Sequence, residues 1–126
     1  MTDSETTLVD SSGWIAYLGD GPKADAFGPY FEREDLLVVP TIVIYEVVKK
    51  LQATLNDAVV QRFLSHAYRA REVELDSSLA IAAAQVSIRH RLAMADAIIY
   101  ATAEAEGAQL VTGDPDFHGL AGVIII

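Results

Sequence analysis

Two kinds of hydrophobic pattern alternate along the chain. Short apolar runs rich in β-branched residues predict buried strands, and longer stretches with apolar residues at every third or fourth position predict helices. The expected strands are residues 6–10, 36–39, 71–75, 109–112 and 122–126, and the expected helices are residues 13–18, 23–31, 41–51, 55–70, 79–91 and 95–107. Ser11–Ser12 and Ser77–Ser78 are expected to cap the helices that follow them. Strands that alternate with helices predict a three-layer α/β/α fold with a mostly parallel five-stranded sheet.

Residues 93–117 form the most informative stretch of the chain. An almost entirely apolar helix carries one acid, Asp96, near its start, and Gly107 is suited to end it. Residues 95–107 span about 20 Å as a helix, and the next strand runs back along part of that length. We therefore expect Asp96 to meet Asp114, which follows the strand. An aspartate near a helix N-terminus also serves as a cap, so a catalytic and a capping role for Asp96 both remain open.

Four acids in this apolar chain are expected to reach one edge of the sheet. Asp10 ends the first strand, Glu46 lies in the first two turns of the helix after the second strand, and Asp114 follows the fourth strand. In parallel sheets, ligands bind beyond the carboxyl ends of the strands, and Asp96 begins the helix that leads into the fourth. Lys50 is expected to form an i,i+4 ion pair with Glu46.

A cluster of carboxylates points to a bound cation. Two carboxylates ~4 Å apart repel by about 4 kcal/mol at an effective dielectric constant of about 20, so a cluster must be protonated or bridged. The chain has no cysteine and its three histidines are scattered. Ligation by oxygen alone favours Mg²⁺, with Mn²⁺ also suitable. Such ions support phosphodiester hydrolysis, although these residues do not identify the substrate.

Composition and charge narrow the class of protein further. We expect one domain over residues 1–126, with the polar residues 1–5 as a disordered tail. No apolar run is long enough to span a membrane, and the absence of cysteine suits a cytoplasmic protein. The net charge of −9 argues against tight, unaided binding of nucleic acid. A cation, a second subunit or a basic partner would have to supply positive charge.

Four blocks spread over nearly the whole chain resemble the PIN-domain ribonucleases, and most closely the VapC toxins of VapBC toxin–antitoxin pairs. The blocks are Leu-Val-Asp-Ser-Ser at 8–12, Pro-Thr-Ile-Val-Ile-Tyr-Glu-Val at 40–47, Leu-Ala-Met-Ala-Asp-Ala-Ile-Ile-Tyr-Ala-Thr-Ala at 92–103 and Leu-Val-Thr-Gly-Asp-Pro-Asp-Phe at 110–117. The resemblance implies a Mg²⁺-dependent endoribonuclease that cleaves single-stranded or looped RNA and is neutralised by a cognate VapB-like antitoxin.

The same resemblance assigns roles to individual residues. It implies that Asp10, Glu46, Asp96 and Asp114 are the catalytic and metal-binding acids, that Asp116 is a further acid in the same turn, and that Ser11 and Thr112 support the site. Gly113 departs from the family, in which this position often carries a basic or polar side chain.

Two other functions and one assembly follow from the same features. A receiver-like signalling domain also places acids and Mg²⁺ at a strand edge, and Asp114-x-Asp116 is similar to the motif of haloacid-dehalogenase-type phosphatases. Both need a lysine near the later strands, whereas the last lysine here is Lys50. We also expect a homodimer, because residues 123–126 form an apolar edge strand and the early helices are rich in aromatic residues (Trp14, Tyr17, Phe27, Tyr30 and Phe31).

Overall fold

The computed structural model describes residues 6–126, so the tail expected over residues 1–5 lies outside the described residues. The strands are β1 (Thr7–Val9), β2 (Val38–Pro40), β3 (Arg71–Val73), β4 (Gln109–Thr112) and β5 (Val123–Ile125). The α-helices are α1 (Ser11–Leu18), α2 (Ala24–Phe27), α3 (Thr41–Thr54), α4 (Asp57–Arg69), α5 (Ser77–His90) and α6 (Met94–Glu106). Short 3₁₀ helices are η2 (Gly28–Phe31), η3 (Glu34–Leu36) and η4 (Pro115–Phe117).

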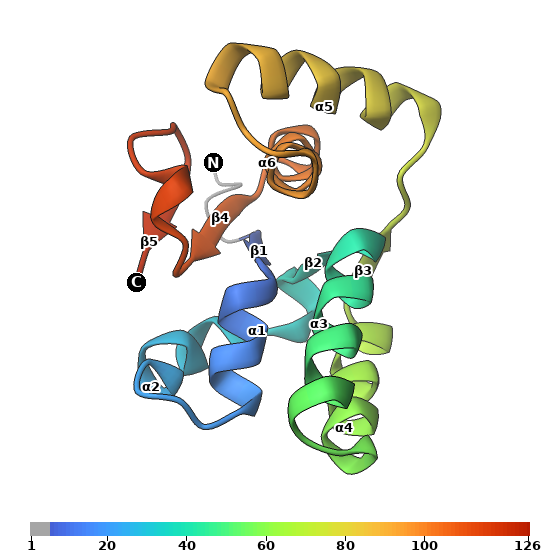
Figure 1. The fold of residues 1–126 in the computed structure, drawn as a ribbon, viewed down its shortest axis with the longest axis vertical. Helices are drawn as coiled ribbons and strands as arrows, with labels where there is room; N and C mark the ends of the chain where they lie inside the picture. The colour runs from blue at the N-terminus through green and yellow to red at the C-terminus, as the bar shows by residue number, and fades with distance from the viewer. Residues whose placement is uncertain (1–5) are drawn as a thin grey trace.

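All strand pairs in the described chain are parallel. The strands form one sheet in the order β1-β4-β5 and a second in the order β2-β3. A single parallel bridge between Thr7 and Leu37 joins the two sheets. Figure 1 shows α1 to α4 on one side of the strands and α5 and α6 on the other. The predicted three-layer, parallel architecture is confirmed, with its five strands divided between two sheets.

The core holds the carboxyl ends of β1 and β4 side by side. Leu8 pairs with Leu110 and Val9 with Val111, and all four side chains are fully buried. Helix α6 is buried along its middle, from Ala97 to Ala103. It ends at Gly107, whose φ of 63° is left-handed and favours glycine, as the sequence predicts. The acids at the ends of these elements are therefore attached to well-packed, buried strands and a buried helix.

Two predicted helix caps are wrong by one residue. Ser11 and Ser12 are the first residues of α1, and the cap is Asp10, whose side chain accepts a hydrogen bond from the backbone N–H of Gly13. In the same way Asp76, rather than Ser77–Ser78, caps α5 by accepting from the N–H of Leu79. In both cases an aspartate in extended backbone precedes the serine pair, and it reaches the free N–H groups first.

Several predicted boundaries differ from the structure. The helix expected over residues 23–31 is a short α2 followed by the 3₁₀ helix η2, because Pro29 lacks the N–H that an α-helix would use. The second strand begins at Val38, after the 3₁₀ helix η3. The third strand ends at Val73, and its first two residues are exposed rather than half-buried.

Three of the five aromatic residues that the sequence suggested for a dimer surface on the early helices are buried, and Tyr17 and Tyr30 are partly exposed. Trp14, Phe27 and Phe31 are buried in the core, with exposed fractions of 1%, 1% and 6%. Trp14 lies against Phe31 and Phe63, and Tyr17 stacks on Phe31 with ring centroids 4.6 Å apart. These aromatic residues stabilise the fold.

No helix within residues 6–126 has the length and apolar character needed to cross a membrane.

Candidate metal and active site

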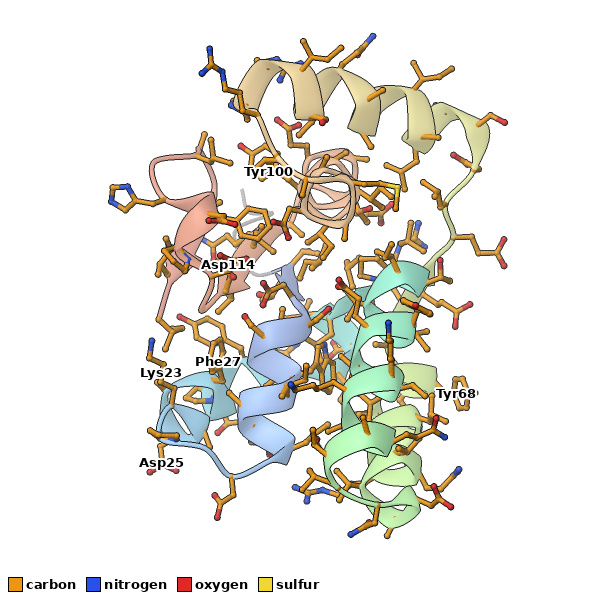
Figure 2. All side chains as sticks on the ribbon, viewed as in Figure 1. Lys23, Asp25, Phe27, Tyr68, Tyr100 and Asp114 are labelled. Carbon is orange, nitrogen blue, oxygen red and sulfur yellow. The ribbon has the colours of Figure 1, made fainter. Side chains whose placement is uncertain are left out.

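Three of the four predicted acids follow the carboxyl ends of parallel strands, and the fourth lies at the start of a helix. Asp10 comes directly after β1, Asp114 lies two residues after β4, and Glu46 is in the second turn of the helix that follows β2. Asp96 is the third residue of α6. Figure 2 shows Asp114 on the loop after β4, in the region between α6 and the start of α1.

Three carboxylates form the closest group. Asp96, Asp114 and Asp116 each offer an oxygen, and these oxygens lie within 4.8 Å of one another. The predicted meeting of Asp96 with Asp114 is therefore observed. Asp114 also accepts a hydrogen bond from the backbone N–H of Asp116 at 2.9 Å, which fixes the turn and presents the two acids together. Asp116, which the resemblance implied as a further acid in the same turn, lies in this closest group.

Asp10 is buried and is held by hydroxyl groups. Its Oδ1 accepts from Ser12 Oγ at 2.6 Å and from the Gly13 N–H at 3.2 Å, and its Oδ2 accepts from Thr112 Oγ1 at 2.6 Å. Burial raises the pKa of Asp10, these three hydrogen bonds lower it, and the charge of Asp114 raises it further. The net direction is upward, so burial outweighs the hydrogen bonds.

Thr112 and Ser12 link Asp10 to the loop that carries Asp114. Thr112 Oγ1 accepts a hydrogen bond from the Asp114 N–H at 2.9 Å while it donates to Asp10. Ser12 Oγ accepts from the Gly113 N–H at 3.1 Å while it also donates to Asp10. Sequence reasoning assigned Ser12 only a capping role. The signal that could have found it is its place two residues after the aspartate that ends a buried strand.

Glu46 borders the group from α3. Its Oε1 accepts a hydrogen bond from Ser11 Oγ at 2.5 Å, which gives Ser11 the supporting contact that the resemblance implied. The expected ion pair between Glu46 and Lys50 is wrong, since the ion pairs found within residues 6–126 do not include it. Glu46 instead binds Ser11, and its charge contributes to the raised pKa of Asp96.

Asp96 carries the clearest electrostatic signature of the site. Its pKa is raised from 3.8 to about 6, chiefly by burial, and then by the charges of Asp114, Asp116, Glu46 and Asp10. The other four predicted acids therefore all raise the pKa of this one carboxylate. The capping role for Asp96 is not observed: the N-cap of α6 is Ala93, and no side chain among the described residues caps this helix.

The residues of the site fit a divalent cation. The donor set consists of carboxylate oxygens, and hard cations such as Mg²⁺ and Mn²⁺ prefer oxygen ligands. Within the described part of the chain, no lysine, arginine or histidine forms an ion pair with these five acids. Their mutual repulsion is thus left uncompensated by protein cations, and a bound metal ion would relieve it.

Comparison with known proteins identifies the family. The model of the PIN domain matches residues 7–123. The chain belongs to the PIN-domain family. This agrees with the resemblance carried by the four sequence blocks. No curated protein matches the chain as a recognisable relative.

Solved structures share the fold of this PIN domain over nearly its full length. A toxin–antitoxin complex from Klebsiella pneumoniae matches with a TM-score of 0.80 and 21% identity, covering 94% of this chain and 95% of that one. VapC20 from Mycobacterium tuberculosis, a sarcin–ricin loop cleaving toxin, matches with a TM-score of 0.76 and 17% identity, covering 95% and 98%. DNA-bound VapBC from Salmonella typhimurium matches with a TM-score of 0.76 and 15% identity, covering 96% of each chain.

Proposed function

We propose that this PIN domain is a Mg²⁺-dependent endoribonuclease toxin that cleaves single-stranded or looped RNA and is neutralised by a cognate VapB-like antitoxin. The observation that carries the proposal is the group of Asp96, Asp114 and Asp116, whose carboxylate oxygens lie within 4.8 Å of one another at the carboxyl ends of the strands. Mn²⁺ is an alternative ion, because it accepts the same oxygen ligands.

We assign the metal-binding and catalytic roles to Asp10, Glu46, Asp96 and Asp114, with Asp116 as a further ligand. A bound ion would lower the pKa of a water molecule and stabilise the charge that develops on the phosphate oxygens. The supporting residues Ser11 and Thr112 hold the acids in place, through Glu46 and through Asp10 respectively. Thr112 also binds the N–H of Asp114, so its hydroxyl sets the position of that loop.

The family and the similar structures support a nuclease over the alternatives. One similar structure is of a sarcin–ricin loop cleaving toxin, and others are of toxin–antitoxin complexes. A receiver-like domain or a haloacid-dehalogenase-type phosphatase needs a lysine near the later strands, and this chain has none after Lys50. We therefore assign the acid cluster to phosphodiester hydrolysis.

The charge of the molecule supports an antitoxin that supplies a cation. The chain has eighteen acidic residues and only nine lysines and arginines. Among the described residues, the acid cluster has no protein counter-ion. An arginine from the antitoxin would bind the carboxylates bidentately and compete with the metal ion. A cytoplasmic location follows from this proposal, since the RNA substrate and the antitoxin are found there.

The protein is further proposed to act as a homodimer. Strand β5 lies at the end of its sheet and pairs only with β4 within the described chain, and Ile125 on it is 39% exposed. An apolar edge of this kind favours pairing with a second copy.

Sequencing of RNA 5′ ends after induced expression tests the proposed activity. The wild-type protein is expected to produce new ends at discrete positions and to arrest growth. Asp96→Asn removes the charge of one ligand while keeping its shape, so it should produce neither effect. New ends at equal abundance with both proteins, at equal expression, would show that the acid cluster does not carry the activity.

A further inference from the structure

A shallow groove leads away from the acid cluster between α1 and α3. Figure 1 shows these two helices side by side. The groove has a volume of about 480 Å³ and is lined by Ser11, Ser12, Ile15, Tyr45, Glu46, Lys49, Lys50 and Ala53. One end of it is formed by the same hydroxyls that bind Glu46 and Asp10. A linear ligand whose reacting group lies at the acid cluster would therefore extend into this groove.

The groove contains two lysines whose charges are not neutralised. Arg33, Arg69 and Arg71 form ion pairs with acids, whereas Lys49 and Lys50 form none within residues 6–126. They follow Glu46 by three and four residues, about one helical turn or ~5 Å along α3. In a chain of net charge −9, this places two uncompensated positive charges immediately beside a site proposed to cleave phosphodiesters.

Tyr45 adds an exposed aromatic ring to the same groove. Its exposed fraction is 61%, and Lys49 Nζ lies 5.6 Å from the ring centroid and donates a hydrogen bond to Tyr45 Oη at 3.5 Å. A neighbouring hollow along α3 shares Tyr45, Lys49 and Ala53 with the groove. Aromatic rings interleaved with cations are the usual means by which proteins bind single-stranded nucleic acid, since bases stack on the ring and phosphates contact the cations.

We propose that Tyr45, Lys49 and Lys50 form a subsite for the single-stranded RNA that flanks the cleaved phosphate. Tyr45 stacks on a base, and the two lysines bind backbone phosphates. The inference rests on the proposed ribonuclease activity and adds the path by which an acidic protein holds an acidic substrate. The complementary charge and the position beside the acids favour RNA over a protein segment as the occupant.

Equilibrium binding of RNA tests the subsite without interference from cleavage. A fluorescently labelled single-stranded RNA oligonucleotide is titrated with the Asp96→Asn protein in Mg²⁺ at several salt concentrations. Adding Lys49→Gln or Lys50→Gln should weaken binding and reduce the slope of log affinity against log salt by about 0.7 for each lost phosphate contact. Adding Tyr45→Ala should raise the Kd about tenfold through loss of stacking, with little change in the salt slope.

Two residues outside the groove provide matched controls. Arg62 is exposed on α4, so Arg62→Gln removes the same charge without touching the groove. Tyr68 on α4 is 70% exposed, and Figure 2 shows it pointing away from the molecule far from Asp114, so Tyr68→Ala removes an aromatic ring elsewhere. Both controls should keep the Kd and the salt slope of the parent protein. An equal effect of control and groove variants would mean that only net charge or general surface matters, which overturns the proposal.

The outcomes separate this proposal from the proposed function. If the wild type neither cleaves nor binds RNA, both are overturned. If it cleaves RNA and the groove variants bind RNA as tightly as their parent, only the subsite is overturned. If the groove variants keep full RNA affinity but no longer bind an antitoxin encoded by the neighbouring reading frame, the groove is a protein-docking surface and the RNA subsite is wrong.

Discussion

Asp96 shows how one residue reports on the whole acid cluster. Its pKa is raised from 3.8 to about 6 because it is partly buried beside other carboxylates. The folded protein therefore favours the protonated form more than the unfolded chain does. As the pH rises from about 4 toward 6, deprotonation of Asp96 lowers the free energy of unfolding of the metal-free protein. Above about 6 this loss of stability is complete.

Thermal melts of Asp96→Asn and wild type test this electrostatic account. In EDTA at pH 7, Asp96→Asn should melt at a higher temperature than the wild type, because the amide relieves repulsion. This difference should shrink toward pH 4, where Asp96 is protonated. Mg²⁺ should raise the wild-type melting temperature, with about 2.7 kcal/mol of added stability at a hundred times its dissociation constant, and should raise that of the variant less. A wild-type melt indifferent to Mg²⁺, with a simply destabilised variant, would contradict the account.

Thr112 is the residue through which Asp10 and the Asp114 loop are joined. Thr112→Val keeps the shape of the side chain but leaves Asp10 Oδ2 and the Asp114 N–H without their partner. Loss of a buried hydrogen-bond partner should lower the free energy of unfolding by about 1–3 kcal/mol and reduce RNA cleavage. Thr112→Ser retains the hydroxyl and is the control. It should keep most of the stability, measured by urea denaturation, and most of the RNA cleavage. A stable, active Thr112→Val protein, or a loss confined to Thr112→Ser, would mean that the methyl group rather than the hydroxyl matters.

At the scale of the elements, the close approach of α1 to its neighbours positions Asp10. A Cβ atom on Gly13 would lie 2.3 Å from Val9 Cγ1 and 2.8 Å from Phe27 Cε1, so no side chain fits there without movement. The N–H of Gly13 is also a hydrogen-bond donor to Asp10. Glycine at this position therefore lets the helix begin directly against β1.

Gly13→Ala should destabilise the protein by about 1–3 kcal/mol through overpacking and should impair cleavage by displacing the start of α1. Gly21→Ala is the matched control, because a Cβ there would meet only ordinary contacts, the nearest at 3.6 Å. Urea denaturation of both variants provides the measurement. A stable, active Gly13→Ala protein would show that α1 can move without disturbing Asp10.

The order of helices and strands could be predicted from the sequence because it depends on the periodicity of apolar residues. The hydrogen bonds and distances within the site could not be predicted, because they depend on contacts between particular residues in the folded chain. Apolar runs located the strands, and parallel topology then placed Asp10 and Asp114 at one edge. The same pattern cannot reveal that Asp10 itself caps α1, since this depends on the rotamer that Ser12 and Thr112 hold. Nor could it separate the close group containing Asp116 from the buried Asp10, because that difference arises from the turn after β4.

At the scale of the whole molecule, dimerisation through β5 is directly testable. Light scattering at micromolar concentration should give the mass of a homodimer. Ile125→Lys places a charge on the exposed edge strand and should shift the protein toward the monomer. Ile81→Lys, on an exposed position of α5, introduces the same charge elsewhere and should leave the dimer intact. A monomeric wild type at this concentration would remove the dimer from the account.

Cleavage by the purified protein tests whether the acid cluster is a metal site that hydrolyses RNA. A single-stranded RNA is incubated with wild type, Asp96→Asn or Asp25→Asn in Mg²⁺, in EDTA, and in EDTA followed by excess Mg²⁺. Asp25 is an exposed acid on α2, and Figure 2 shows it far from Asp114, so its amide controls for loss of charge. Wild type and Asp25→Asn should cleave the RNA, EDTA should abolish this cleavage and excess Mg²⁺ should restore it, whereas Asp96→Asn should not cleave. Cleavage that persists in EDTA, or in Asp96→Asn at the wild-type rate, would contradict this prediction.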